Sequence, residues 1–248
     1  MGIVPQQSAT KLARLWTPLL RYLSEKSGLT LRFKTAPDIP TFEQRLAAGA
    51  YDFAYMNPYH YTVFHEAPGY LAFAHATNKR IKGILVVRKD SPIQSLDELT
   101  GATLAFPAPA AFAASVLPRA YFRNEGIAIT PKYVNSHDSV YRSVAKGLYP
   151  AGGGVMRTFH NVDQSVSEQL RILWTSEGYT PHAIAAHPSL PSDIVDRLQR
   201  AMLAMHADSE GEALLKRINI EGFVAAHDSE WDDVRSLDIQ LLDDLVKQ

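Results

Sequence analysis

Short apolar runs alternate with amphipathic stretches along almost the whole sequence, and this alternation limits the chain to a few folds. Runs such as Tyr51–Met56, Gly83–Arg88 and Thr103–Phe106 are rich in β-branched and aromatic residues, which is typical of buried strands. Between such runs, apolar residues recur every three or four positions, as in Leu12–Leu23, which predicts helices. Strands that alternate with helices form βαβ units. The sequence therefore predicts an α/β fold with mainly parallel sheets flanked by helices.

The other predicted elements follow from the same patterns. Further strands are expected at Gly2–Pro5, Leu31–Lys34, Tyr70–Ala76, Lys132–Val134, Arg171–Trp174 and His182–Ala186. Further helices are expected at Phe42–Ala48, Ala110–Asn124, Ser136–Ala145, Ser192–Ala207, Gly211–Ile218 and Ser229–Val246.

Turn-forming residues mark two places where the chain is expected to pass between lobes. Arg88–Pro92 follows a strand and precedes a new βα series, and Gly178–Pro181 ends that series before another strand. We therefore expect a first lobe made of residues 1–88 and 181–248, with residues 89–180 inserted as a second lobe.

Composition excludes several function classes. Lys and Arg number 25 against 26 Asp and Glu, so the net charge is −1, and a nucleic-acid partner, which calls for a basic excess, is not expected. The chain has no Cys, which excludes disulfides and thiol nucleophiles. No apolar run approaches the roughly 20 residues of a membrane-spanning helix. Because Gly2–Val4 has the character of a strand interior, we expect the natural chain to begin upstream of Met1.

Known catalytic templates do not occur in this sequence, and no catalytic residue, cofactor or metal is expected. The nine histidines do not recur at the spacing of three or four that places two ligands on one helix face. One glycine run, Gly152–Gly154, leaves two interpretations open. It is either a tight turn after a strand or a loop whose bare backbone lets a ligand approach closely.

Polar and aromatic residues gather around the turn that follows the strand Tyr51–Met56. In open α/β sheets, ligands bind beyond the carboxyl ends of strands. A tyrosine offers both a ring face and a hydroxyl. We therefore expect Tyr55, Asn57 and Tyr59 to contact a ligand, and Tyr51 to pack in the interior.

Three loops that enter helices after strands are candidate anion sites, because a helix N-terminus carries unpaired N–H groups and a partial positive charge. They begin at Gln6-Gln7-Ser8, at Pro109–Phe112 and at Ser136-His137-Asp138. Arg157, after the glycine run, could supply a bidentate contact to a carboxylate or phosphate; a surface salt bridge is the alternative.

Several segments together resemble the phosphate/phosphonate substrate-binding proteins of ABC transporters, in order along nearly the whole chain. The segments that carry the resemblance are QQSATKLARLWTPLLRYLSEKSG, APDIPTFEQRLAAGAYDFAYMNPYHY, GILVVRKDSPIQSLDELTG, AFPAPAAF, VNSHDSVYRSVAKG and LRILWTS.

This resemblance implies a type II periplasmic binding fold, in which two α/β lobes are joined by two crossing segments and hold the ligand in a cleft. It also implies a protein outside the cytoplasm, in the periplasm or anchored to the membrane. Its partners would be a small-molecule ligand and an ABC permease, and a monomer is expected.

The resemblance also assigns site residues, with departures. Where relatives hold the phosphonate with a Ser-Thr-Ser run, this chain has Ala111-Phe112-Ala113. His137 matches the pocket histidine of the family. Where binders of aminoalkylphosphonates place acids, this chain has Arg157 and His182. The expected ligand is therefore anionic, with an apolar or aromatic part that suits Phe112. The full expected set is Gln7, Ser8, Tyr55, Asn57, Tyr59, Phe112, His137, Asp138, Arg157 and His182.

The leading hypothesis is thus the solute-binding component of an ABC importer, which performs no chemistry. An alternative is an extracytoplasmic sensing domain that reports ligand occupancy to a signalling protein. A third is an enzyme using His137 or His182 as an acid–base; however, neighbours such as His137 and Asp138 on a helix point apart.

Overall fold

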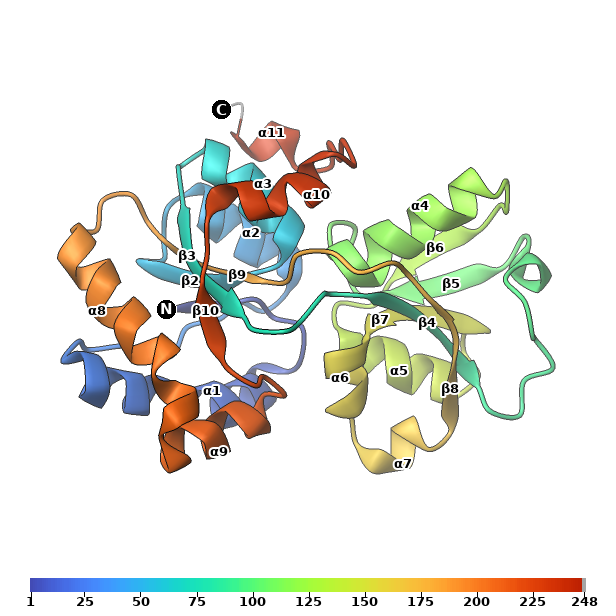
Figure 1. The fold of residues 1–248 in the computed structure, drawn as a ribbon. Helices are drawn as coiled ribbons and strands as arrows, with labels where there is room; N and C mark the ends of the chain where they lie inside the picture. Colours follow the sequence, from blue (N-terminus) through green and yellow to red (C-terminus); the bar gives the residue numbers. More distant parts are fainter. Residues whose placement is uncertain (247–248) are drawn as a thin grey trace. The chain divides into compact units, whose positions relative to one another are not determined.

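The computed structural model describes residues 1–246 and shows two compact units, which are described in turn (Figure 1). Unit 1 comprises Met1–Pro5, Ala9–Arg80 and the chain from Tyr179 onward. Unit 2 comprises Gln6–Ser8 and Ile81–Gly178. Each unit is built on one five-stranded sheet.

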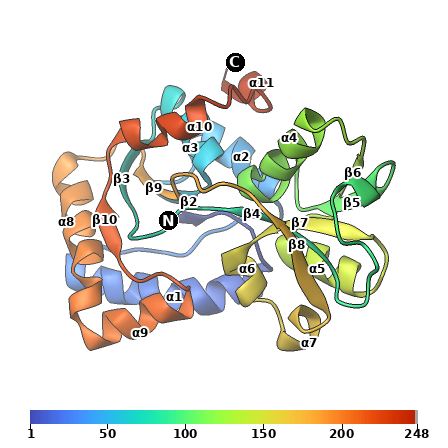
Figure 2. The same cartoon turned by 45° about the vertical axis from the view of Figure 1, so that its right-hand side comes forward.

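The sheet of unit 1 has the strand order β1-β2-β9-β3-β10. Its strands are β1 (Gly2–Ile3), β2 (Phe53–Met56), β3 (Leu71–Ala76), β9 (Ala183–Ala186) and β10 (Phe223–Ala225). Its helices are α1 (Ala9–Ser27), α2 (Ile39–Ala47), α3 (Pro58–Glu66), α8 (Ser192–Leu203), α9 (Ser209–Arg217), α10 (Asp232–Arg235) and α11 (Asp243–Val246), with 3-10 turns η3 (Met205–Ala207) and η4 (Asp228–Trp231). Within this unit, α2 and α3 lie on one side of the sheet and α1 and α9 on the other (Figures 1 and 2).

The sheet of unit 2 has the order β6-β5-β7-β4-β8. Its strands are β4 (Gly83–Arg88), β5 (Thr103–Phe106), β6 (Thr130–Tyr133), β7 (Ala151–Val155) and β8 (Leu170–Thr175). Its helices are α4 (Leu117–Asn124), α5 (His137–Ala145), α6 (Met156–His160) and α7 (Gln164–Ser167), with a 3-10 turn η1 (Asp97–Leu99) and a π-helical turn η2 (Phe112–Val116) that runs into α4.

Strand β4 shows why the apolar runs become interior strands. Ile84 and Val86 pack on one face in a core that includes Val140 of α5, while Leu85 and Val87 pack on the other face. All four are fully buried. A strand covered on both faces needs a continuous apolar run, which is the pattern in the sequence.

The glycine run Gly152–Gly154 is neither a turn nor a ligand loop, which corrects both sequence interpretations. These residues form the middle of β7, between β5 and β4. A Cβ on Gly153 would lie 1.9 Å from the carbonyl oxygen of Ala114, and one on Gly154 would lie 2.1 Å from the Tyr141 hydroxyl. The glycines therefore let η2 and α5 pack directly against the strand.

The prediction of mainly parallel sheets is corrected in one respect, because both sheets are mixed. Three strand pairings are parallel and five are antiparallel among the described residues. Parallel neighbours need a crossover, usually a helix. Strands β4 and β9 instead enter their sheets by extended connections from the other unit, so each runs against its neighbours.

The expected lobe boundary after residue 88 is wrong for β4, and two other expected elements differ from the structure. β4 pairs with β7 and β8, so the chain passes into unit 2 after Arg80 rather than after Arg88. The strand expected at Leu31–Lys34 is reduced to one bridge between Gly2 and Lys34. The helix expected over Ser229–Val246 is divided into η4, α10 and α11. Residues 247–248 of the expected first lobe lie outside the described part.

Candidate functional site

The loop Gln6–Ser8 is held at the start of α5, so the first and third candidate segments, Gln6–Ser8 and Ser136–Asp138, meet within unit 2. Ser136 caps α5 by accepting a hydrogen bond from the Ser139 amide at 3.1 Å. The His137 amide donates to the carbonyl oxygen of Gln6 at 3.1 Å. One N–H of the first helical turn is thus used to hold the loop.

His137 is a buried residue with a defined partner on one side of its ring. Only 1% of its surface is exposed, and Nδ1 lies 2.9 Å from Thr158 Oγ1 in α6. Burial, and secondarily the charge of Arg157, lower the pKa of His137 from 6.5 to about 3. The imidazole is therefore neutral at physiological pH and presents Nε2 as either one donor or one acceptor.

Thr158 belongs to a small polar network that fixes the position of this imidazole. Its hydroxyl lies 2.8 Å from the Tyr141 hydroxyl and 3.1 Å from the carbonyl oxygen of Val155. The Val155 amide donates to Tyr141 at 3.1 Å. Burial raises the pKa of Tyr141 well above its usual value, so this network carries no net charge.

Arg157 precedes Thr158 in α6 and supplies the permanent positive charge of this region. Its guanidinium donates to the side-chain oxygen of Gln6. The Gln6 amide is neutral, so this hydrogen bond orients the guanidinium without adding a negative charge beside it. The arrangement of Arg157, Gln6 and His137 can therefore receive an anionic group.

The segment that enters η2 is apolar, as its sequence indicates. Ala108, Ala110, Ala111 and Phe112 are each at most 4% exposed. The turn closes with the amides of Ser115 and Val116 both donating to the carbonyl oxygen of Ala111. π-Helical turns inside helices are frequent at functional sites. No side-chain hydroxyl is available at positions 111–113.

In unit 1, the structure brings Tyr55 and His182 together. Their rings stack with centroids 4.9 Å apart and an interplanar angle of 16°, and Trp16 of α1 packs on Tyr55 at 4.8 Å. The contact arises because β2 pairs with β9 and His182 directly precedes β9. The three residues form an aromatic cluster at the carboxyl end of β2.

Asn57 and Tyr59 each accept a structural hydrogen bond from a backbone amide. Asn57 caps α3 by accepting a hydrogen bond from the His60 amide at 2.7 Å. The Tyr59 hydroxyl accepts one from the Leu242 amide at 3.0 Å, and burial raises its pKa to about 12. Ligand contact by these two residues stays a prediction.

The remaining expected residues of unit 2 lie close to the same loop and helix. Gln7 is 4% exposed, and its Nε2 has no hydrogen-bond partner among the described residues. Ser8 is exposed, and Asp138 is half-buried in the first turn of α5. Gln6 was predicted only as part of the helix-entry loop Gln6-Gln7-Ser8. Thr158 was not predicted, and its one signal in the sequence is adjacency to Arg157.

Among the described residues, no three His, Asp or Glu side chains are grouped to hold a metal ion. None of the helices described is long and apolar enough to cross a membrane.

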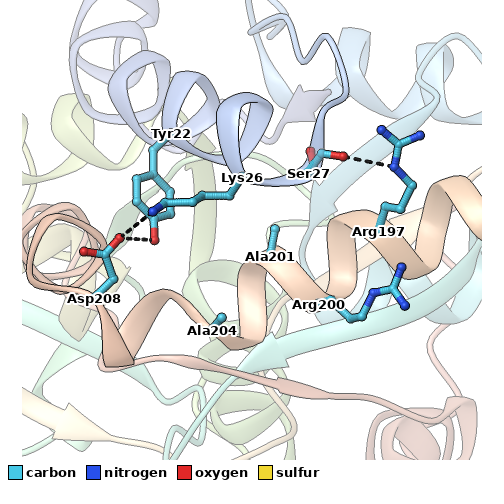
Figure 3. A pocket seen from close by; sticks show the side chains of 8 residues that line it. All are labelled: Tyr22, Lys26, Ser27, Arg197, Arg200, Ala201, Ala204 and Asp208. Atoms are coloured by element: carbon cyan, nitrogen blue, oxygen red, sulfur yellow. Dashed lines mark hydrogen bonds and ion pairs between the residues drawn. The ribbon is translucent and has the colours of Figure 1, made fainter.

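A groove of about 350 Å³ runs between α1 and α8, over Ala201 and Ala204 (Figure 3). It contains none of the expected site residues.

Comparisons with known proteins agree on one family. A family model described as the periplasmic substrate-binding protein of phosphonate ABC transporters matches residues 1–231. The chain belongs to this family. It is 24% identical to the phosphate-import protein PhnD of Mycolicibacterium smegmatis, over 95% of this chain and 83% of that protein.

Solved structures with the same fold include two phosphonate-binding proteins. The binding protein component of an ABC phosphonate transporter from Pseudomonas aeruginosa has a TM-score of 0.88 at 18% identity, covering 96% of this chain and 84% of that chain. PhnD1 of Prochlorococcus marinus, solved in complex with methylphosphonate, has a TM-score of 0.86 at 15% identity, covering 95% of each chain. The expected two-lobe periplasmic binding fold is thereby confirmed.

Membership decides between the functional hypotheses at the level of the family. The chain is a substrate-binding protein of a phosphonate/phosphate ABC transporter, and this assignment is supported over the sensing alternative. The family consists of transporter components rather than enzymes, works outside the cytoplasm, and implies a small-molecule ligand and a membrane permease as partners.

Proposed function

We propose that this chain captures a small organic anion through Arg157, Gln6 and His137 and delivers it to an ABC permease. The observation that carries the proposal is the guanidinium of Arg157, oriented by a neutral amide beside a neutral buried imidazole. A ligand with one anionic head group finds a permanent charge and, in the tautomer whose Nδ1 accepts from Thr158, a neutral donor at His137 Nε2. It requires no proton transfer from the protein.

The apolar turn supports an organic ligand rather than free inorganic phosphate. Relatives include a phosphate-import protein and a protein solved with methylphosphonate. Here positions 111–113 offer no hydroxyl, and Phe112 is fully buried. A highly charged phosphate would lose several donors there, at about 1–3 kcal/mol each. We therefore infer a phosphonate, phosphate ester or carboxylate with an apolar substituent.

A thermal-shift and calorimetry panel tests the proposal. The probes are inorganic phosphate, methylphosphonate, phenylphosphonate, 2-aminoethylphosphonate, a phosphate monoester and benzoate. A ligand present at 100 times its Kd stabilises the folded protein by about 2.7 kcal/mol. We expect phenylphosphonate or benzoate to outrank inorganic phosphate. If none of the organic anions binds, the proposal fails.

Arg157→Gln should remove binding of whichever probe succeeds. Arg142→Gln is the matched control, because Arg142 is an exposed arginine of the same unit that pairs with Asp163. Equal loss of binding in both variants, or in neither, would refute the role given to Arg157.

A gain-of-function variant tests the role of the apolar turn. The triple substitution A111S/F112T/A113S installs three hydroxyl donors and removes the phenyl ring. We expect its affinity for methylphosphonate to rise and its preference for phenylphosphonate to fall. An unchanged order of affinities in a folded variant would show that this turn does not contact the ligand.

A further inference from the structure

Besides the loop Gln6–Ser8 of unit 2, which lies between two parts of unit 1 in the sequence, two linkers connect the units. One short element of unit 1 contacts both linkers. The outgoing linker, residues 77–82, joins β3 to β4, and the return linker, residues 176–182, joins β8 to β9. The outgoing linker passes from unit 1 to unit 2 after Arg80, and the return linker passes back to unit 1 after Gly178.

Asp233 of α10 contacts both linkers with a single carboxylate oxygen. Its Oδ2 lies 2.9 Å from Nη2 of Arg80, the last residue of unit 1 in the outgoing linker. The same atom accepts a hydrogen bond from the amide of Thr180, the second residue of unit 1 in the return linker, at 2.8 Å. A carboxylate that accepts from a backbone amide and a guanidinium joins two segments 100 positions apart in the sequence.

The two residues before α10 that face the linkers add further contacts. The Thr180 hydroxyl lies 2.6 Å from the carbonyl oxygen of Glu230 and 3.1 Å from Asp233, so its one hydrogen favours Glu230. Trp231 is fully buried and donates from Nε1 to the carbonyl oxygen of Pro181 at 2.9 Å.

Glu230 also reaches the strand that leads into the outgoing linker. Its carboxylate lies 2.8 Å from Nε2 of His75 in β3, while Nδ1 of His75 lies 2.9 Å from the carbonyl oxygen of Ala76. Both ring nitrogens of His75 thus have a polar neighbour, and the contact with Glu230 fixes the end of β3.

We infer that Glu230, Trp231 and Asp233 form a linker clamp, in which Asp233 is the positioning residue for the hinge between the units. The clamp ties the unit 1 ends of both linkers to one element, so bending of these two linkers is confined to their residues on the unit 2 side. Asp233 touches no expected ligand residue. Its role in uptake rests on the proposed function, whereas its role in the hinge does not.

An isolated surface ion pair would not carry this inference, because such pairs contribute little to stability. Here one oxygen of Asp233 accepts a hydrogen bond from the Thr180 amide and pairs with the Arg80 guanidinium, which belong to two separate segments. The Asp233 side chain is only 26% exposed. Its other oxygen, Oδ1, is buried without a hydrogen-bond partner among the described residues. The side-chain contacts of Asp233 are thus made to the two linkers.

Hydrogen exchange on the ligand-free protein tests the clamp first. Asp233→Ala removes both contacts, and Asp233→Asn keeps an oxygen acceptor but removes the charge. We expect the Thr180 amide to exchange about tenfold to a hundredfold faster in Asp233→Ala, since its bond to a charged acceptor is lost, and less so in Asp233→Asn. Asp232→Ala is the matched control, because the neighbouring Asp232 is largely exposed and forms an ion pair with Arg235, away from both linkers.

The second measurement reads the hinge itself. Because the chain has no Cys, L148C and E25C place one spin label on each unit at exposed positions. We expect the distance distribution between the labels to be broader in Asp233→Ala than in Asp232→Ala or the parent.

Two outcomes would overturn the clamp. One is a label distribution in folded Asp233→Ala that superimposes on the control. The other is Thr180 exchange that rises only in proportion to the loss of global stability, which is what a purely structural role predicts. If Asp233→Ala does not fold, the same comparison is decided with Asp233→Asn. Both measurements use no ligand, so their result is independent of the ligand proposed above.

Discussion

His137 makes the folded protein less stable in acid, by an amount that follows from its burial. The folded-state pKa of about 3 lies below the ordinary 6.5, so the unfolded chain takes up a proton in the pH range between them and the folded chain does not. Stability therefore falls as the pH drops below about 6.5. Between pH 7.5 and pH 5 the expected loss from this residue is about 2 kcal/mol, taken as RT ln(1 + 10^1.5).

Urea unfolding at the two pH values, followed by circular dichroism, measures this loss. Other groups also titrate in this range. The loss of unfolding free energy is therefore compared between the parent and His137→Asn, whose side-chain amide can still form a hydrogen bond with Thr158. We expect the parent to lose about 2 kcal/mol more than the variant. The control is His160→Asn, at an exposed histidine of unit 2, which should lose as much stability between the two pH values as the parent does.

The reasoning is refuted if His137→Asn loses as much stability in acid as the parent does. It is refuted equally if NMR shows the His137 ring of the folded protein titrating between pH 5 and 8.

Three further substitutions test packing and capping. Gly153→Ala forces a Cβ against the carbonyl oxygen of Ala114 at 1.9 Å, so we expect a loss of about 3 kcal/mol or more in urea unfolding; a loss below about 1 kcal/mol would contradict the packing of β7. Tyr59→Phe removes the acceptor for the Leu242 amide, which should cost about 1 kcal/mol and speed proteolysis near the C-terminus; unchanged cleavage would contradict this contact. Asp38→Ala removes the cap of α2 and should lower the free energy of unfolding by about 1 kcal/mol, whereas Asp38→Asn should lower it less; equal losses would contradict the capping role.

Interior strands could be predicted from the sequence because their cause is local. Gly83–Arg88 and Thr103–Phe106 occur in the structure with the predicted bounds. Each is an apolar run bounded by polar or turn-forming residues, and burial on both faces requires such a run. The capped helix α5 was likewise recognisable from Ser136.

Strand β7 could not be predicted, because the reason for its composition is a tertiary contact. Glycine weakens a strand, so Gly152–Gly154 indicated a turn or a loop. Only the folded unit shows that the Ala114 carbonyl and the Tyr141 hydroxyl occupy the space of the missing side chains. The prediction for the C-terminal segment was wrong for a related reason. Around Asp233 its polar residues bind other segments, and Asp238 has a φ of 47°, which breaks the expected helix.

The candidate site was predictable as residue types but not as a network. Arg157 and the helix entry at His137 were recognised from their residue types and positions, and the family resemblance added the match of His137 to a pocket histidine. The structure places both residues beside the loop that contains Gln6. The hydrogen bond between His137 and Thr158 depends on how α5 and α6 pack, which sequence spacing does not show. Residue types identify where charge is available, whereas packing decides which protonation state a residue has.

The protonation state of the site gives a final prediction about the ligand. His137 is neutral throughout the range above its lowered pKa of about 3, and a guanidinium stays charged. Neither His137 nor Arg157 changes charge between pH 5.5 and 8. A change in ligand affinity within that pH range therefore reports chiefly the ionisation of the ligand. A carboxylate ligand is fully ionised in that range. Because neither the ligand nor the two site residues changes charge, its Kd should be nearly constant. A phosphate monoester loses its second proton near pH 6, so its Kd should change across the same interval. Calorimetry at several pH values therefore distinguishes the two classes. A steep pH dependence for a carboxylate, abolished by His137→Asn, would show that His137 titrates and that its neutral assignment is wrong.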